Sequence, residues 1–300
     1  MMTYIERLTV ARLALEGLSV GDAFGDNFFI HADIAQAMIH SRALPKPVWL
    51  FTDDTNMALS VYHVLHQHHD ILQDELATSF SHHYDPARGY GPAMHRVLSQ
   101  IASGDSWKEV ATRLFDGQGS YGNGAAMRVA PIGAYFYDNL EKVSELARKS
   151  AEITHAHPEG IAGAIAIAVA AGVACRLHSK TAPTRAEFID MIVPFVPDSE
   201  VKTGIRRARD IQSNVVEHVI GMIGNGYHMS AQDTVPFALW CAGESLSDYE
   251  NALWLTASGL GDVDTNCAIV GGIVAVYVGY DGIPSEWIQY RGPLPQWAFS

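Results

Sequence analysis

The spacing of apolar residues predicts helices along most of the chain. In two segments, apolar side chains recur every three or four positions, as on the buried face of an amphipathic helix: Ile5, Leu8, Ala11, Leu15 and Leu18, and later Met57, Val61 and Val64 or Leu65. The segment "TRAEFIDMI" begins with Thr184 and Glu187 at the spacing of a capping box, which marks a helix N-terminus. Alternating polar and apolar runs, which would predict strands, are scarce.

Further helices are predicted by longer apolar segments. The run from Ile161 to Cys175 is rich in Ala, Gly, Ile and Val and is shorter than the ~20 residues of a membrane span, so we expect a buried core helix. "SDYENALWLTASGL" and "NCAIVGGIVAVYVG" predict two more helices, the second apolar on all sides and therefore central. Because no repeat and no long linker interrupts this pattern, we predict a single all-α domain over residues 1–300.

Composition and charge narrow the class of protein. The chain has 300 residues and is 48% hydrophobic, which is ample for one large core. Its net charge of −13 argues against a nucleic-acid-binding surface, because such surfaces are basic; nucleic acid is expected only as a modified substrate. The N-terminal "MMTYIERLTVARL" carries charges where a secretory leader would be apolar, and the three cysteines form no CxxC pair. We expect a soluble, cytoplasmic protein with no membrane partner.

An acidic cluster stands at the start of one predicted helix, in "FTDDTNMAL". Thr52, Asp53, Asp54 and Thr55 follow one another there. A helix cap uses these residue types, and acidic side chains favour the positive end of a helix dipole. A hard divalent cation also requires such a density of oxygen ligands, usually from more than one segment. The second interpretation therefore requires a second acidic cluster elsewhere.

That second cluster lies in "GLGDVDTNCAIVGG", where Asp262, Asp264 and Thr265 enter the central apolar helix. Taken alone, it could also be a cap with an Asx turn. The two clusters share one composition, two Asp and a Thr at the mouth of a buried helix. Together they predict a site for two Mg²⁺ or Mn²⁺ ions if the ions lie about 4 Å apart. Zinc fits less well, because no Cys or His accompanies the carboxylates.

Glycines gather between the predicted helices, most densely in "RGYGPAM" and "GQGSYGNGAAMR". Glycine commonly ends a helix, which accounts for any one of these segments. Several such loops in one chain also favour anion binding, because short glycine-rich loops expose backbone N–H groups at helix starts. Phe115 and Tyr121 flank one loop; they are candidates to stack on a base or are ordinary core residues.

Taken together, these motifs resemble the ADP-ribosylglycohydrolase family. The resemblance covers nearly the whole chain and keeps the motif order "GLSVGDAFG", "FTDDTNMAL", "RGYGPAM", "GSYGNGAAMRVAP", "THAHPEG" and "GDVDTNCAIVGG". "DPARGYG" and "FDGQGSYGNGAAMRV" look most like the branch that cleaves ADP-ribose from serine. The resemblance implies a compact all-α domain with a dimetal cleft, two Mg²⁺ or Mn²⁺ ions, and ADP-ribose or an ADP-ribosylated substrate.

The resemblance also implies roles for individual residues. The metal ligands would be Thr52, Asp53, Asp54, Asp262, Asp264 and Thr265, and the catalytic residues among them Asp53, Asp54 and Asp264. The loop around the diphosphate would comprise Gly119, Ser120, Tyr121 and Gly122, with His155 beside it. Phe115 and Tyr121 would sandwich adenine. A further loop of the substrate cleft would comprise Gly89, Tyr90 and Gly91.

One position departs from the family pattern. The first glycine-rich segment of the family commonly ends in a Glu that ligates a metal and serves catalysis, and Phe29 stands there in this chain. Asp22, Asp26 and Asp33 are the nearby acids that would replace it. The leading hypothesis is a hydrolase that releases ADP-ribose from an acceptor. The alternatives are an ADP-ribose-binding pseudoenzyme and a dimetal phosphohydrolase that releases phosphate or AMP.

Overall fold

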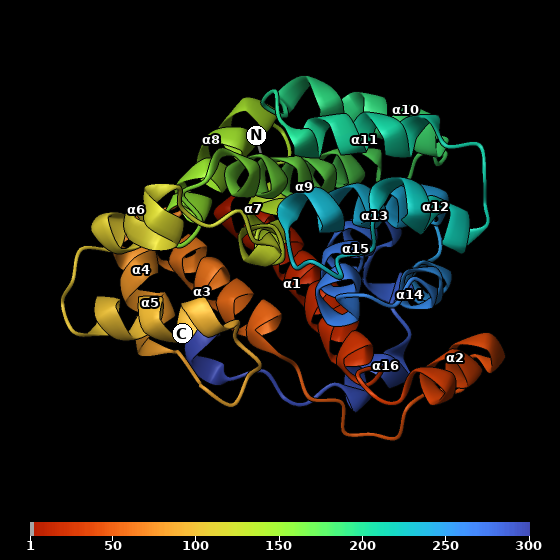
Figure 1. Ribbon diagram of the computed structural model, residues 1–300, viewed down its shortest axis with the longest axis horizontal. Coiled ribbons are helices and arrows are strands. Elements are labelled where there is room, and N and C mark those ends of the chain that lie inside the picture. Colours follow the sequence, from red (N-terminus) through yellow and green to blue (C-terminus); the bar gives the residue numbers. More distant parts are fainter. Residues whose placement is uncertain (1–2) are drawn as a thin grey trace.

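A computed structural model describes residues 3–300, and helices follow one another through all of it (Figure 1). No strand forms in these residues; Trp49 with Arg291 and Gly122 with Ser230 make isolated bridges. The α-helices are α1 (Tyr4–Asp26), α2 (Ala32–Ser41), α3 (Asp53–His68), α4 (Gln73–His82), α5 (Pro92–Ala102), α6 (Trp107–Gly117), α7 (Ala130–Tyr135), α8 (Leu140–Glu152), α9 (Pro158–Leu177), α10 (Arg185–Ile192), α11 (Glu200–Asp210), α12 (Val216–Ile223), α13 (Ala231–Glu244), α14 (Tyr249–Ser258), α15 (Val263–Val278) and α16 (Ser285–Tyr290). Short 3₁₀ turns are η1 (Asn123–Ala125), η2 (Val193–Phe195), η3 (Tyr280–Gly282) and η4 (Gln296–Phe299).

The prediction of an all-α fold is confirmed, and most of the predicted helices form. The capping box of α10 is present, with Glu187 N donating to Thr184 Oγ1 and Thr184 N donating to Glu187. The first apolar stripe extends less far than predicted. Ile5 is 77% exposed although Ala11, Leu15 and Leu18 are fully buried, because the first turn of α1 lies beyond the helices that cover the rest of it.

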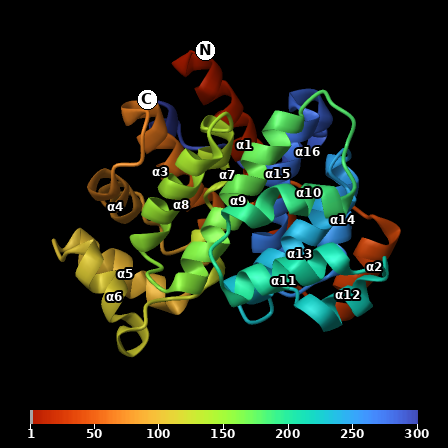
Figure 2. The ribbon, with the colours of Figure 1, turned by 90° about the horizontal axis from the view of Figure 1, so that it is seen from above.

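The long apolar segment becomes α9, which lies in the middle of the helices in Figures 1 and 2. Its length of 20 residues and mean hydropathy of 2.0 would suffice to cross a membrane. However, 83% of its most apolar stretch is buried inside the protein, against α7, α8, α13 and α15. This burial is the behaviour predicted for a core helix.

The most extensive contact between two helices of the described residues joins α1 to α15, and it determines where the site forms. A Cβ atom on Gly17 would lie 2.4 Å from Gly271 O, and one on Gly21 would lie 2.1 Å from Cys267 O. The backbones therefore touch along a ridge of glycines spaced four residues apart on α1. Because the two helices run antiparallel, the last turn of α1 lies against the first turn of α15 (Figure 1).

Candidate functional site

The site begins where the end of α1 meets the start of α3. Asp22 is fully buried, and its carboxylate accepts hydrogen bonds from Thr52 N at 2.9 Å and Thr55 N at 3.0 Å. The hydroxyls of Thr52 and Thr55 donate to it as well. Asp22 thereby fixes the turn that carries the first acidic cluster against α1.

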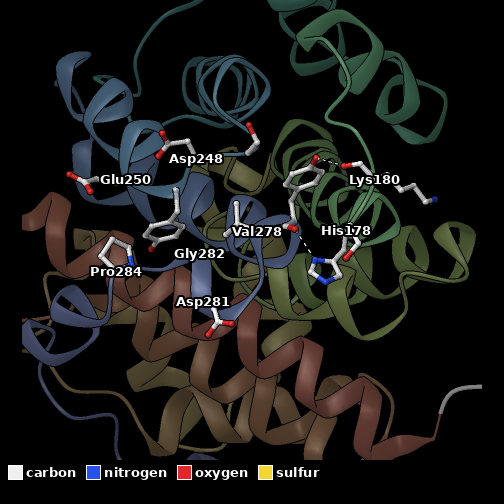
Figure 3. Close-up of a pocket in the computed structure, with 12 residues that line it drawn as sticks. His178, Lys180, Asp248, Glu250, Val278, Asp281, Gly282 and Pro284 are labelled. Carbon is white, nitrogen blue, oxygen red and sulfur yellow. Dashed lines mark hydrogen bonds between the residues drawn. The ribbon is translucent and has the colours of Figure 1, made fainter.

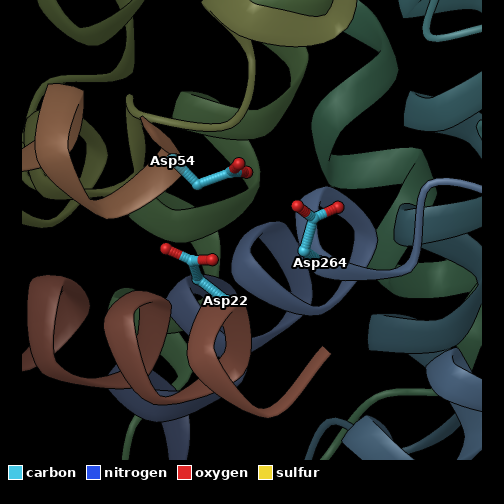
Figure 4. Close-up of side chains that lie close together, drawn as sticks. All are labelled: Asp22, Asp54 and Asp264. Carbon is cyan, nitrogen blue, oxygen red and sulfur yellow. The ribbon is translucent and has the colours of Figure 1, made fainter. Parts of the chain in front are cut away.

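Neither acidic cluster serves mainly as a helix cap. Thr52 is the N-cap of α3 and Asp262 the N-cap of α15, yet neither side chain accepts a capping hydrogen bond. The side chains turn toward each other instead. Carboxylate oxygens of Asp22, Asp54 and Asp264 lie within 4.8 Å of one another (Figure 4), and Thr265 Oγ1 lies 3.4 Å from Asp54 Oδ2. Segments more than 200 residues apart in sequence therefore form one acidic group.

The acidic group is electrostatically unfavourable without a cation. Burial and the adjacent Asp264 carboxylate hold the pKa of Asp54 well above its usual range. Burial, and after it the charge of Asp22, raise the pKa of Asp53 to about 7. Asp54 Oδ1 is buried and has no hydrogen-bond partner in residues 3–300. A buried, unpaired carboxylate oxygen among like charges is a typical position for a metal ligand.

The carboxylates differ in how many lone pairs remain free. Both oxygens of Asp22 already accept hydrogen bonds from Thr52 and Thr55. Asp22 therefore orients the Thr52–Thr55 turn, and the oxygens left free to ligate belong mainly to Asp53, Asp54 and Asp264. One oxygen of Asp262 accepts a 2.6 Å hydrogen bond from Asn123 Nδ2, which ties the second acidic cluster to the glycine loop.

A cleft of about 540 Å³ opens over the acidic group. Every predicted metal ligand lines it, and so do the predicted substrate residues Gly89, Gly91, Phe115, Ser120, Tyr121, Gly122 and His155. The other two predicted substrate residues lie behind its wall. Tyr90 is buried with its hydroxyl 2.8 Å from Asn56 Nδ2. Gly119 has φ +77°, and a Cβ atom there would lie 2.7 Å from His157 N.

The glycine loop forms one wall of the cleft. It is held by Ala231 N donating to Tyr121 O and by Asn123 N donating to Met229 O, at 2.9 and 3.0 Å. The backbone amides of Ser120 and Tyr121 make no hydrogen bond within residues 3–300, so they are free to bind an anion. His155 lies under this loop and is 4% exposed.

The predicted aromatic pair lies at the mouth of the cleft. The rings of Phe115 and Tyr121 are 6.3 Å apart between centroids and inclined by 30°, and they are 54% and 46% exposed. Their separation is close to twice a stacking distance of about 3.5 Å, so a flat ring fits between them with a small movement. Core packing, the alternative interpretation of this pair, does not describe such exposed rings.

Comparisons with known proteins identify the family of the chain. The family model described as ADP-ribosylglycohydrolase matches residues 3–297. The chain belongs to the ADP-ribosylglycohydrolase family. Members of this family are glycosidase-type hydrolases, and this chain is one of them.

Similar relatives cover nearly the whole chain of this ADP-ribosylglycohydrolase. It is 29% identical to ADP-ribosylhydrolase ARH3 of Homo sapiens, over 93% of this chain and 88% of the relative. The ARH3 of Xenopus tropicalis is 30% identical, over 92% and 89%. An uncharacterized protein of Archaeoglobus fulgidus is 31% identical, over 93% and 90%. A solved structure titled "ADP-ribosylglycohydrolase-related protein complex" superposes with a TM-score of 0.66 at 25% identity, over 96% of this chain and 94% of that one.

In this ADP-ribosylglycohydrolase, the three acids that could replace the Glu missing at Phe29 lie in different environments. Phe29 lines the cleft and is 54% exposed. Asp26 lines the same cleft, and burial raises its pKa. The side chain of Asp33 is 87% exposed on α2, beside His31 and outside the cleft. Asp33 therefore has no place in the site, whereas Asp22 and Asp26 do.

Sequence reasoning missed two polar residues of the site. Asn123 donates to Asp262 and to Thr234 Oγ1, and so ties the glycine loop to the second acidic cluster. Arg128 is fully buried beneath the loop. Both lie inside the motif "GSYGNGAAMRVAP", where an Arg among small apolar residues was the available signal.

A second cavity, of about 560 Å³, lies at the other end of α15 (Figure 3). Several of its polar groups make hydrogen bonds that stabilise the fold. His178 Nδ1 lies 2.8 Å from Tyr277 O, and the Tyr277 hydroxyl donates to Lys180 O. Asp248 caps α14 by accepting from Asn251 N. Acidic and basic side chains are mixed around this cavity, so its charge selects no ligand.

Proposed function

We propose that the chain hydrolyses the glycosidic bond between ADP-ribose and an acceptor, which is a protein side chain, a nucleobase or a small molecule, and releases intact ADP-ribose. The observation that carries the proposal is the convergence of the two acidic clusters, with the unpartnered Asp54 Oδ1, beside the glycine loop and the aromatic pair. One cleft thus offers oxygen ligands, anion donors and a stacking site, in the combination that ADP-ribose requires.

We propose that Thr52, Asp53, Asp54, Asp262, Asp264 and Thr265 hold two Mg²⁺ or Mn²⁺ ions. The donor set supports hard divalent cations, because it consists of carboxylate and hydroxyl oxygens alone. When bound, such ions polarise a water molecule and the hydroxyls of the distal ribose. Asp22 keeps Thr52 and Thr55 in position through the four hydrogen bonds that it accepts from them, and so preserves the shape of the ligand set.

We propose that Asp26 supplies the proton that the leaving group of the acceptor needs. The transition state of glycoside cleavage resembles an oxocarbenium ion, and protonation of the leaving oxygen lowers its energy. Asp26 makes no ion pair or hydrogen bond through its side chain in residues 3–300. It is the last residue of α1, where the negative end of the helix dipole favours a protonated carboxyl. It therefore serves where the family has Glu and this chain has Phe29.

We propose that the glycine loop and His155 bind the diphosphate, while Phe115 and Tyr121 stack on adenine. Binding at these two places orients the distal ribose over the acidic group and so contributes to the rate. The motifs "DPARGYG" and "FDGQGSYGNGAAMRV" favour a serine-linked acceptor.

Mass spectrometry of the products tests the proposal. Serine-linked, arginine-linked and nucleobase-linked ADP-ribose are each incubated with the protein in EDTA, Mg²⁺ or Mn²⁺. The expected result is metal-dependent release of ADP-ribose, fastest from the serine-linked substrate. Release of AMP would support the phosphohydrolase instead. Tight binding without any release would support the pseudoenzyme, which the hydrolase names of the relatives do not favour.

A further inference from the structure

Arg128 is a buried cation, and none of the ion pairs formed within residues 3–300 includes it. Its guanidinium donates to uncharged groups instead, namely backbone and hydroxyl oxygens and the Met57 sulfur at 3.6 Å. Nη2 donates to Ser150 O at 2.7 Å and to Thr154 Oγ1 at 2.9 Å, and Nη1 donates to Gly124 O at 3.3 Å. Because a guanidinium has only donors, the Thr154 hydroxyl must accept this hydrogen bond.

The Thr154 hydroxyl has one further partner in the described chain, His155 Nδ1 at 2.7 Å. A hydroxyl has a single proton. One of the two lone pairs of Thr154 Oγ1 is occupied by Arg128, and in residues 3–300 its proton has no acceptor other than Nδ1, so the buried hydroxyl donates to Nδ1. His155 Nδ1 is then an acceptor, and the ring proton sits on Nε2. Burial lowers the pKa of His155 to about 3, in agreement with a neutral ring.

His155 Nε2 lies at the glycine loop, on the cleft side of the ring. A Cβ atom on Gly122 would come within 3.2 Å of Nε2, and one on Gly124 within 3.0 Å. Because both of these positions are glycine, neither of them places a side chain over the Nε2 edge of the ring. Nε2 makes no hydrogen bond in residues 3–300, and His155 lines the cleft, so its N–H is free for a ligand.

We propose that Arg128 and Thr154 are positioning residues that fix His155 as a neutral imidazole whose Nε2–H donates to an anionic group of the ligand. Arg128, Thr154 and His155 thus form a relay of hydrogen bonds, and the direction of the bond between Thr154 and His155 determines what the ring presents to the ligand. If Thr154 accepted from Nδ1–H instead, Nε2 would present a lone pair, which repels a phosphate oxygen. Under the proposed function the anionic group is the diphosphate of ADP-ribose, and His155 takes no part in proton transfer.

Nitrogen-15 NMR of the imidazole rings tests the relay without any ligand. His155→Gln assigns the resonances of His155. Wild type and Thr154→Ser, which keeps the hydroxyl, are expected to show an unprotonated Nδ1 and a protonated Nε2. Thr154→Val has the same shape without the hydroxyl, and the two nitrogen shifts should converge as both tautomers become populated. His157 is the internal control, because its Nδ1 accepts from Glu159 N independently of Thr154.

The same spectrum tests Arg128. Arg128→Lys cannot reach both Ser150 O and Thr154 Oγ1, so the shifts of His155 should converge as in Thr154→Val. Unchanged shifts would remove Arg128 from the relay. A wild-type ring protonated on Nδ1 would overturn the whole proposal.

Calorimetry connects the relay to the ligand. Thr154→Val should bind ADP-ribose about tenfold more weakly, the scale of one hydrogen bond to a charged group. It should bind adenosine, which lacks phosphate, as wild type does, and Thr154→Ser should restore ADP-ribose binding. Equal affinity in Thr154→Val and wild type would contradict a role in binding the anion. If the wild-type protein shows the expected tautomer of His155 but does not bind ADP-ribose, the proposed function is refuted and the positioning role of Arg128 and Thr154 stands.

Discussion

Replacing Asp54 by Asn tests whether the acidic group exists to bind metal. Asp54 is 1% exposed, lies within 4.8 Å of carboxylate oxygens of Asp22 and Asp264, and has an oxygen without a partner. Asn keeps the shape and removes the charge. Without a cation, Asp54→Asn should therefore stabilise the protein, since it relieves repulsion. With Mg²⁺ or Mn²⁺ present, it should remove the stabilisation that the wild type gains.

The expected magnitude follows from the distances. Two unit charges at 4.8 Å, the upper limit of the spacing between these carboxylate oxygens, repel by about 3 kcal/mol at an effective dielectric constant near 20. Partial protonation, which the raised pKa of Asp54 implies, reduces this value. One kcal/mol corresponds to about 2 °C in Tm for a chain of this size, so the variant should melt up to about 6 °C above wild type in EDTA. A metal at 100 times its Kd contributes about 2.7 kcal/mol, or about 5 °C.

Scanning calorimetry at pH 8, in EDTA and in Mn²⁺, measures both effects. Wild type should gain about 5 °C on addition of metal, and Asp54→Asn should gain almost nothing. Asp33→Asn is the matched control, because Asp33 is exposed and lies outside the cleft; it should behave as wild type. An Asp54→Asn protein that melts below wild type in EDTA, or that keeps the full metal shift, would refute the reasoning.

Four further outcomes are expected. Tyr121→Ala should weaken ADP-ribose binding by about 1–3 kcal/mol and leave ribose 5-phosphate binding unchanged in calorimetry; equal losses would indicate a collapsed loop. Asp26→Asn should lower kcat by about 10²-fold or more while ADP-ribose affinity stays near wild type, and an unchanged kcat would exclude Asp26 as the acid. Phe29→Glu restores the family's carboxyl on an exposed cleft position and should raise kcat in the same release assay; a lower kcat would show that Phe29 has its own role. The pKa of Asp53 is raised to about 7 in the folded protein, whereas in the unfolded chain it is about 4. In EDTA, Tm should therefore fall as the pH rises from about 4 to about 7 and level off above, because a folded state that holds its proton more tightly loses stability as that proton leaves. Addition of Mn²⁺ should flatten this profile, and a Tm that rises over the same range would contradict the assigned direction.

Local patterns in the sequence were sufficient for much of the fold. Apolar periodicity predicted α1 and α3, and the Thr184–Glu187 capping box predicted the start of α10, because these signals arise from neighbours within one or two turns. The all-round apolar character of α9 and α15 predicted their burial for the same reason. The predicted burial of Ile5 was wrong, because burial depends on which other elements cover a helix, and the residues of the first turn of α1 do not specify that.

The sequence by itself also determined that two Asp and Thr clusters stand at helix starts, and that this chain has Phe29 where the family pattern has a carboxylate. Only the tertiary structure decided between capping and a shared site, because the close contact of α1 with α15 brings together segments far apart in the chain. The same packing decided that Asp22 orients Thr52, that Asp26 faces the cleft and that Asp33 does not. Carboxylates at such positions look alike in sequence, and burial and the partners across the fold assign them different roles.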